Sequence, residues 1–225
     1  MIERVIITGA SGGLGLETAK ILLDKGYKVL NLSRKKPPVD EIEHIEMDLT
    51  VEESIDNAVR EIEKNYSDFS ALINNAGAII MHELEEINYN DVQTVFQVNL
   101  IGPMYLASKL MRLVKENGAD IVNVGSTVGY KAYHKQAAYN TSKWAMRGLN
   151  LYLQTELKNT GIRVIGFNPG GMKTEFFDKN MQETYDASQY MDPKSPGKMI
   201  VTILETPKEM EVSEIVINRK VASIK

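Results

Sequence analysis

The chain has 225 residues, 43% hydrophobic and 25% charged, which suffices for one globular domain with a full core. A net charge of −4 and a pI of about 5.5 exclude a strongly basic surface for nucleic acid or anionic lipid. The absence of cysteine excludes disulfides, a thiolate nucleophile and Cys-ligated metal sites. Because we find no cationic, apolar leader and no window approaching about 18 apolar residues, we expect a soluble cytoplasmic protein that binds neither membrane nor nucleic acid.

Short apolar runs alternate with helical patterns along the whole chain. Such alternation with short connections requires parallel strands and right-handed crossovers. We therefore predict an α/β fold, a Rossmann-type doubly wound parallel sheet in a three-layer α/β/α sandwich, as a single domain over 1–225. The predicted strands are 5–7, 27–32, 45–48, 71–73, 120–125, 162–167 and 214–218, and the predicted helices are one that ends at Lys25-Gly26, then 50–65, 88–115, 136–158 and 195–204.

Two local signals concern the predicted helices. Thr50 and Glu53 form a capping-box pattern at the start of the helix 50–65. Pro103 lies inside the helical pattern 88–115, and we expect it to kink that helix because proline lacks a backbone N–H.

A glycine-rich stretch, residues 8–15 with the sequence TGASGGLG, joins the first strand to the first helix. Glycine permits the positive φ of a tight turn, lets backbone N–H groups approach a phosphate and allows close helix–strand packing. The helix N-terminus adds unpaired N–H donors and a positive dipole end. An ordinary tight turn also uses glycines, so the stretch predicts a dinucleotide site only together with further motifs.

Tyr139 and Lys143 are four residues apart in a helical pattern, which puts both on one face of the helix. An ammonium beside a phenol stabilises the phenolate and lowers the pKa of the tyrosine, which can then exchange a proton with a carbonyl or alcohol oxygen. The same spacing is common in ordinary exposed helices. Ser126 favours the catalytic interpretation, because it ends the preceding strand, where a hydroxyl can bond the same substrate oxygen.

With these motifs in this order, the chain resembles the short-chain dehydrogenase/reductase family over nearly its full length. The resemblance implies that Tyr139 is the general acid, that Ser126 holds the carbonyl, and that Lys143 lowers the pKa of the tyrosine and binds the nicotinamide ribose. It implies that Asn99 anchors a water in a proton relay and that Thr174 contacts the carboxamide. The expected cofactor contacts are Gly9, Ser11, Gly12, Gly13, Leu14, Gly15, Ser33, Arg34, Asp48, Leu49, Asn75, Ala76, Gly77, Tyr139, Lys143, Pro169, Gly170 and Thr174.

The residues after the second strand bear on the choice of cofactor. An acid that binds the ribose 2′-hydroxyl of NAD is expected there, and an arginine accommodates the 2′-phosphate of NADP. The chain has Ser33 and Arg34 at this place. We therefore favour NADP(H) over NAD(H).

The predicted function is that of an NADP(H)-dependent oxidoreductase that interconverts a carbonyl and a secondary alcohol by hydride transfer. The alternative is an NADP-binding regulator or scaffold that retains the fold without turnover, and a dehydratase or epimerase is a third possibility. Sugar, steroid, acyl-thioester and small-ketone substrates all remain open. We expect no metal, and we expect a homo-oligomer, a dimer or tetramer, although the segment 216–220 lacks the glycine-rich ending of tetrameric relatives.

Other segments suggest where the substrate enters. Residues 172–193 show no clean period, and we expect them to form a substrate loop that acts as a mobile lid. Tyr130, Tyr133 and His134 are candidates for the mouth of the substrate site. For Trp144 we expect packing in the core or between helices.

Overall fold

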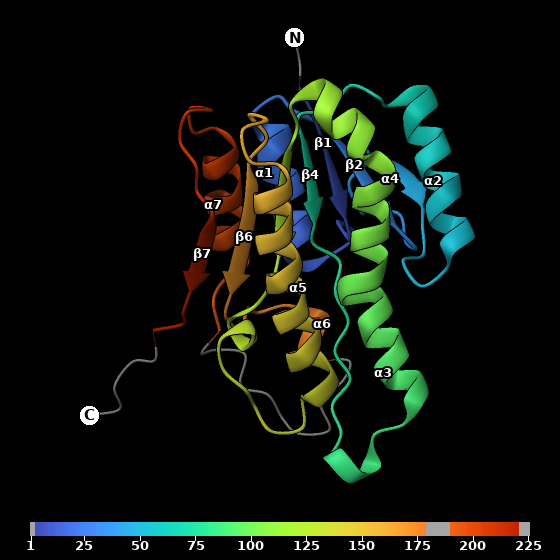
Figure 1. Cartoon of the computed structure of the whole chain (residues 1–225), viewed down its shortest axis with the longest axis vertical. Coiled ribbons are helices and arrows are strands. Elements are labelled where there is room, and N and C mark those ends of the chain that lie inside the picture. The colour runs from blue at the N-terminus through green and yellow to red at the C-terminus, as the bar shows by residue number, and fades with distance from the viewer. Residues whose placement is uncertain (1–2, 179–189, 221–225) are drawn as a thin grey trace.

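The structure is a computed structural model of the chain and describes residues 3–178 and 190–220. Seven strands form one sheet in the order β3-β2-β1-β4-β5-β6-β7, and every pairing is parallel (Figure 1). The middle of the predicted substrate loop, residues 179–189, lies outside the described residues. The strands are β1 Arg4–Thr8, β2 Lys28–Ser33, β3 Glu43–Glu46, β4 Ala71–Asn74, β5 Asp120–Val124, β6 Val164–Pro169 and β7 Glu214–Ile217.

Helices connect all consecutive strands except β2 and β3, which a loop joins, and the predicted doubly wound α/β fold is confirmed. The strand boundaries differ from the predicted ones by at most two residues. The helices are α1 Gly13–Asp24, α2 Glu52–Asn65, α3 Tyr89–Phe96, α4 Gly102–Asn117, α5 Ala137–Glu156, α6 Glu175–Asp178 and α7 Lys194–Leu204, with a π-helical segment Gln97–Ile101 between α3 and α4 and 3₁₀ turns at Leu84–Glu86 and Thr127–Gly129.

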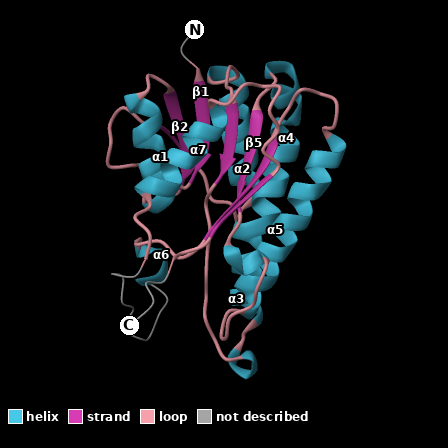
Figure 2. Ribbon diagram, turned by 90° about the vertical axis from the view of Figure 1, so that its left-hand side faces the viewer, coloured by secondary structure: helices cyan, strands magenta, loops and turns pink. Residues whose placement is uncertain are grey.

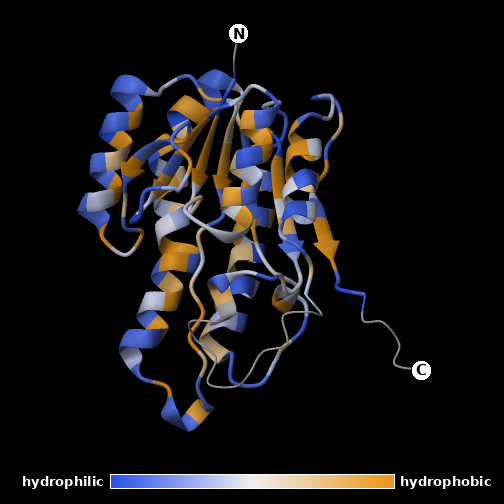
Figure 3. Ribbon diagram, turned by 180° about the vertical axis from the view of Figure 1, so that it is seen from behind, coloured by the Kyte–Doolittle hydropathy of each residue, from blue (hydrophilic) through white to orange (hydrophobic). Residues whose placement is uncertain are grey.

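Two hydrophobic cores lie on the two faces of the sheet. Helices α2, α4 and α5 cover one face, and α1 and α7 cover the other (Figures 1 and 2). Alternate residues of β1 serve both cores, because Ile6 belongs to the first and Val5 and Ile7 to the second. The central strands are therefore mainly apolar on both faces, apart from single buried polar residues, whereas the helices are polar on their outer faces (Figure 3).

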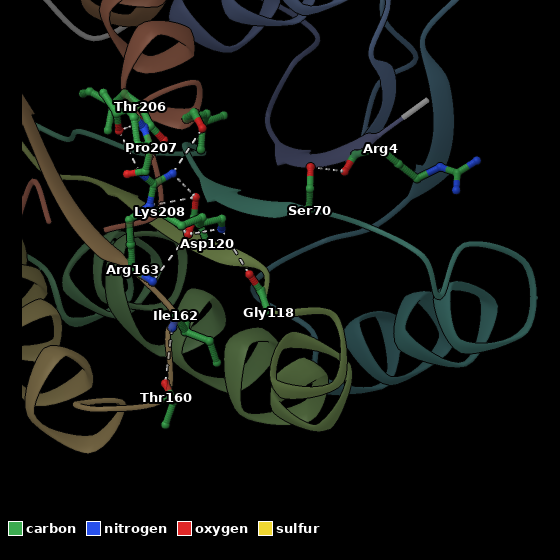
Figure 4. Close-up of polar contacts among 12 residues, drawn as sticks. Arg4, Ser70, Gly118, Asp120, Thr160, Ile162, Arg163, Thr206, Pro207 and Lys208 are labelled. Carbon is green, nitrogen blue, oxygen red and sulfur yellow. Dashed lines mark hydrogen bonds and ion pairs between the residues drawn. The ribbon is translucent and has the colours of Figure 1, made fainter. Parts of the chain in front are cut away.

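A buried ion group fastens the sheet at the amino ends of β5 and β6 (Figure 4). Arg163 donates to Asp120 at 2.6 Å, and both side chains are less than 5% exposed. Lys208 pairs with the other oxygen of Asp120 at 2.7 Å, and Arg163 also donates to the carbonyls of Leu204 and Thr206. A buried charge without such partners is costly, so this group fixes the segment after α7 against the sheet.

The predicted capping box at Thr50 is wrong. The N-cap of α2 is Val51, which makes no side-chain cap bond. The hydroxyl and the backbone N–H of Thr50 donate instead to Asp48 Oδ1, at 2.7 and 2.8 Å. The Asp48 carboxylate thus accepts both hydrogen bonds that Thr50 can donate, and the Thr50 side chain is not used to cap the helix.

The long helix has a π turn ahead of Pro103. The predicted helix 88–115 is realised as α3, the π-helical segment Gln97–Ile101 and α4. Proline cannot donate to the residue four positions earlier, and the helix widens by one residue immediately before it. This widening contains Asn99, which is 1% exposed.

Candidate active site

A cleft of about 1100 Å³ lies at the carboxyl ends of the parallel strands. Ligands bind at this edge of doubly wound sheets because the loops after successive strands meet there. The cleft brings together Ser126, Tyr139, Lys143 and every predicted cofactor residue except Gly15. Of the predicted catalytic residues, Asn99 is absent from its lining.

The glycine loop has the backbone that the sequence predicts. Gly9 and Gly13 have φ angles of +73° and +56°, which favour glycine. Gly15 lies against the loop itself, because a Cβ there would lie 2.6 Å from the carbonyl oxygen of Gly9. A Cβ on Gly12 would meet no atom within 4 Å. The loop is therefore tightly packed at Gly15 and open toward the cleft at Gly12.

The N-terminus of α1 lies at this opening, and no acidic side chain of its first turn occupies it. Its N-cap, Gly12, makes no side-chain cap bond, and the first turn contains no acidic residue. The first N–H groups of a helix have no intrahelical acceptor and carry the positive end of the helix dipole. The residues present therefore fit a diphosphate at this place.

Two buried polar residues of the strands, which sequence reasoning did not assign to the site, hold the loops around the cleft. Asn31 Oδ1 accepts the backbone N–H of Ala10 at 2.7 Å. Thr8 Oγ1 accepts the N–H groups of Asn75 and Ala76, both at 3.0 Å. A polar side chain inside an apolar strand needs a partner, so polar residues within the strand patterns are the signal that could have identified them.

Ser126, Tyr139 and Lys143 form one buried group, with exposed fractions of 8%, 5% and 4%. The phenol of Tyr139 is hydrogen-bonded to the Ser126 hydroxyl. Lys143 Nζ donates to the carbonyl oxygen of Val124 at 3.0 Å and lies 5.8 Å from the centroid of the Tyr139 ring. The three side chains therefore lie close together, as the sequence predicts.

Burial dominates the protonation of this group. It raises the pKa of Tyr139 to about 12, and the hydrogen bond from Ser126 lowers that pKa by less. Burial lowers the pKa of Lys143 to about 8. The predicted lowering of the tyrosine pKa by Lys143 is wrong for this structure, because desolvation of the phenolate outweighs the other effects. At neutral pH, Tyr139 is a phenol with a proton to donate.

Asn99 lies outside the cleft lining, and its side chain makes three hydrogen bonds within the protein. Its Oδ1 accepts the N–H of Ala78 at 2.8 Å, and its Nδ2 donates to the carbonyl of Ala78 and to Ser142 Oγ at 2.8 and 2.9 Å. The side chain thus ties the loop after β4 to α5, one residue before Lys143. Its role as the anchor of a water stays a prediction.

The end of β2 lacks an acid, as the sequence indicates. Residues 33–39 contain none, and Arg34 is 74% exposed with its Nη1 3.9 Å from Asp48 Oδ2. Ser33 Oγ accepts from Asn31 Nδ2 and donates to the carbonyl of Lys35, both at 2.8 Å. This end of the cleft therefore presents an exposed guanidinium beside a fixed hydroxyl.

Of the three residues predicted at the mouth of the substrate site, one lines the cleft and two do not. Tyr133 lines the cleft, whereas Tyr130 and His134 are outside its lining. His134 is 79% exposed and lies 3.2 Å from Glu83. Trp144 is 49% exposed on α5, so packing in the core is wrong, and the other predicted role, packing between helices, stays a prediction.

Phe176 and Tyr190, from the two described ends of the predicted substrate loop 172–193, line the cleft, and so does Arg219, which sequence reasoning did not assign to it. The ring centroids of Phe176 and Tyr139 are 6.0 Å apart. The lack of a period predicted the loop 172–193 as a whole, whereas Arg219 follows the last strand, where no sequence pattern singled it out. Thr174 also lines the cleft, with its Cγ2 3.4 Å from the position of a Cβ on Gly13.

Two absences hold for residues 3–178 and 190–220. No group of three or more His, Asp or Glu side chains there is placed to hold a metal ion. No helix in that part of the chain has the length and apolar character needed to cross a membrane.

Known proteins share both the sequence pattern and the fold. The family described as short chain dehydrogenase matches residues 3–185. An uncharacterized oxidoreductase of Schizosaccharomyces pombe is 32% identical over 89% of this chain and 77% of its own. An alcohol dehydrogenase from Thermococcus sibiricus superposes with a TM-score of 0.86 at 23% identity, over 97% of each chain. A 3-ketoacyl-(acyl-carrier-protein) reductase from Brucella melitensis also gives 0.86, at 24% identity over 96% of each chain.

Proposed function

Because the chain belongs to the short-chain dehydrogenase family, we propose that it is an NADP(H)-dependent oxidoreductase that interconverts a carbonyl and a secondary alcohol. The observation that carries the proposal is the buried group of Ser126, Tyr139 and Lys143 in the same cleft as the open N-terminus of α1. One end of the cleft suits a diphosphate and the other holds a proton donor.

Residues of the glycine loop would hold the diphosphate of the cofactor, and Lys143 would bind the nicotinamide ribose. When bound, this cofactor supplies a hydride to the carbonyl carbon in reduction. For the 2′-phosphate of NADP, Arg34 is a suitable partner, because a guanidinium forms charge-assisted hydrogen bonds with phosphate. Solved structures of this fold contain either form, since the Thermococcus enzyme is complexed with 5-hydroxy-NADP and the Brucella enzyme with NADH.

Tyr139 and Ser126 handle the carbonyl oxygen. The Ser126 oxygen accepts from the N–H of Val128 at 3.3 Å, and its own proton can shift from the Tyr139 oxygen to a bound carbonyl oxygen. Tyr139 gives its phenolic proton to the same oxygen as the hydride reaches the carbon, and the product is an alcohol. The ammonium of Lys143 stabilises the phenolate that remains. In the reverse direction, the phenolate takes the proton of the alcohol.

The competing function is a regulator or scaffold that binds NADP without turnover. Fold alone does not separate the two functions. The buried phenol and ammonium favour the enzyme, because both are costly to bury and a sensor needs neither. The dehydratase or epimerase stays an alternative, and the cytoplasmic location and homo-oligomeric state stay predictions.

The test is the variant Tyr139→Phe, assayed against a panel of carbonyl compounds with NADPH and NADH. Because general acid catalysis contributes about 10²- to 10⁴-fold, kcat is expected to fall by at least about 10² while the Kd for NADPH changes little. Tyr152→Phe is the matched control, since Tyr152 is 60% exposed on the same helix. Wild-type turnover by Tyr139→Phe contradicts the mechanism, and tight NADPH binding without any turnover by the wild type favours the regulator.

A further inference from the structure

Arg219, which follows β7, lies next to the turn after β6, and the same turn borders the segment after β5 that carries Ser126. Arg219 lines the cleft. A Cβ placed on Gly170 would lie 3.5 Å from the backbone N of Arg219 and 3.7 Å from Cγ2 of Thr127, the residue after Ser126. The parallel order of β5, β6 and β7 thus brings a basic residue from the end of the chain to the side of the cleft that holds the proton donor.

The guanidinium of Arg219 is held over an aromatic ring. Its Cζ lies 4.4 Å from the centroid of Tyr190. A Cβ on Gly171 would collide with the same ring, so Tyr190 packs directly on the turn after β6. Stacking on an aromatic face leaves the N–H groups at the guanidinium edge free to donate, and it limits the side chain to few orientations.

A second arginine–tyrosine pair provides an internal comparison. Arg147 lies over the ring of Tyr130 at 4.3 Å and also donates to the carboxylate of Glu214 at 3.1 Å. Among the residues that the structure describes, no carboxylate lies within ion-pair distance of Arg219, and its side chain makes no hydrogen bond. The guanidinium of Arg147 therefore has an acid of the protein as its partner, whereas that of Arg219 has none among the described residues.

Basic side chains outnumber acidic ones around this end of the cleft. Besides the buried Lys143, the described lining residues after β5 include three basic side chains and one acid: Lys131, Lys173, Arg219 and Glu175. Lys131 and Lys173 are exposed, whereas Arg219 is partly buried. A cation with free donors at a partly desolvated position favours an anionic ligand more strongly than exposed lysines do.

We propose that Arg219 binds an anionic group of the substrate, so that the preferred substrate is a carbonyl compound that carries a carboxylate. The planar fork of donors matches the two oxygens of a carboxylate. With the carboxylate at Arg219 and the carbonyl oxygen at Ser126 and Tyr139, the substrate is held at two points. This inference rests on the proposed function, because it assumes that a carbonyl is reduced at Tyr139.

The experiment compares keto acids with their methyl esters, using acetoacetate and levulinate as probes with NADPH. Wild-type kcat/KM is expected to favour the acids. Arg219→Gln is expected to lower kcat/KM for the acids by about 10- to 150-fold, the range of a charge-assisted hydrogen bond, and to leave the esters unchanged. Arg219→Lys keeps the charge without the planar fork of donors, and its kcat/KM for the acids is expected to lie between those of the wild type and Arg219→Gln. Lys198→Gln, at an exposed position of α7 outside the cleft lining, is the control and is expected to change little.

A second measurement does not need turnover. Binding of 4-hydroxypentanoate, the alcohol product of levulinate, to the NADPH complex is followed by the fluorescence of NADPH in wild type and in Arg219→Gln. We expect Kd to rise by the same 10- to 150-fold factor in the variant.

The outcomes separate this inference from the proposed function. Equal kcat/KM for acids and esters, with turnover abolished in Tyr139→Phe, overturns the role of Arg219 and leaves the reaction intact. An increase in the Kd for NADPH alone in Arg219→Gln assigns the cation to the cofactor and also overturns it. Loss of 4-hydroxypentanoate binding in Arg219→Gln, in a protein that turns over no carbonyl, supports the anion site and contradicts the proposed function.

Discussion

Replacing Lys143 by methionine is expected to stabilise the folded protein while abolishing its activity. The ammonium is 4% exposed, and among the described residues no carboxylate pairs with it. Burial lowers its pKa from 10.5 to about 8. A cation that the fold disfavours lowers stability, and methionine fills nearly the same volume without a charge.

The magnitude follows from the shift in pKa. One pKa unit corresponds to about 1.4 kcal/mol, so the shift of Lys143 costs about 3 kcal/mol below pH 8. The methionine variant also loses the hydrogen bond to the carbonyl of Val124, which contributes about 1 kcal/mol. At pH 7 we therefore expect the variant to be about 2 kcal/mol more stable than the wild type.

The sign of the pH dependence is specific to this lysine. Between pH 8 and 10.5 the unfolded chain keeps the Lys143 proton and the folded chain has lost it. The wild type therefore gains stability as the pH rises through this window, by up to about 1.4 kcal/mol per unit, and the variant lacks this gain. Tyr139 is present in both proteins, so its titration largely cancels in the difference.

Urea unfolding of both proteins at pH 7, 8, 9 and 9.5 measures this difference. We expect the advantage of Lys143→Met to shrink steadily above pH 8, with kcat and NADPH affinity both reduced at every pH. Lys198→Met, at an exposed position of α7, is the control and should show no such trend. A difference in free energy of unfolding that is constant from pH 7 to 9.5 would refute the argument that burial depresses this pKa.

Two further predictions concern the cofactor. Arg34→Ala should weaken NADPH binding by about 10- to 150-fold and leave NADH nearly unchanged, as measured by fluorescence titration, and equal losses for both cofactors would contradict a contact with the 2′-phosphate. Gly12→Ala should leave the thermal midpoint unchanged, because a Cβ there meets no protein atom within 4 Å, but it should weaken both cofactors by obstructing the approach to the helix N-terminus; unchanged affinity would place the diphosphate elsewhere.

Much of the fold could be predicted because it depends on local patterns. The glycine loop sets the first turn through the positive φ of Gly9 and Gly13, and buried parallel strands appear in the sequence as short apolar runs. The position of Ser126 followed from strand ends meeting at one edge of the sheet, and the shared helix face of Tyr139 and Lys143 followed from their spacing. These inferences needed only the order of the elements and the spacing within one helix.

The errors arose where neighbours in space outweigh neighbours in sequence. The pKa of Tyr139 depends on how deeply the fold buries the phenol, which the spacing to Lys143 does not reveal. Thr50 matches the capping pattern, but its hydroxyl and N–H donate to the carboxylate of Asp48 instead. Trp144 fits a packed helix face by residue type, but whether a neighbouring element covers that face is a property of the tertiary arrangement.

The distribution of paired and unpaired cations connects the fold to the chemistry. At the amino ends of the strands, the buried Arg163 has the full carboxylate of Asp120 as its partner. At the carboxyl ends, Lys143 and Arg219 have no acidic partner among the described residues, although the chain carries a net charge of −4. Since an unpaired buried cation costs free energy, its retention at this edge is best explained by anionic groups that complete the pairing during function: the phenolate of Tyr139 for Lys143, and the carboxylate of the substrate for Arg219.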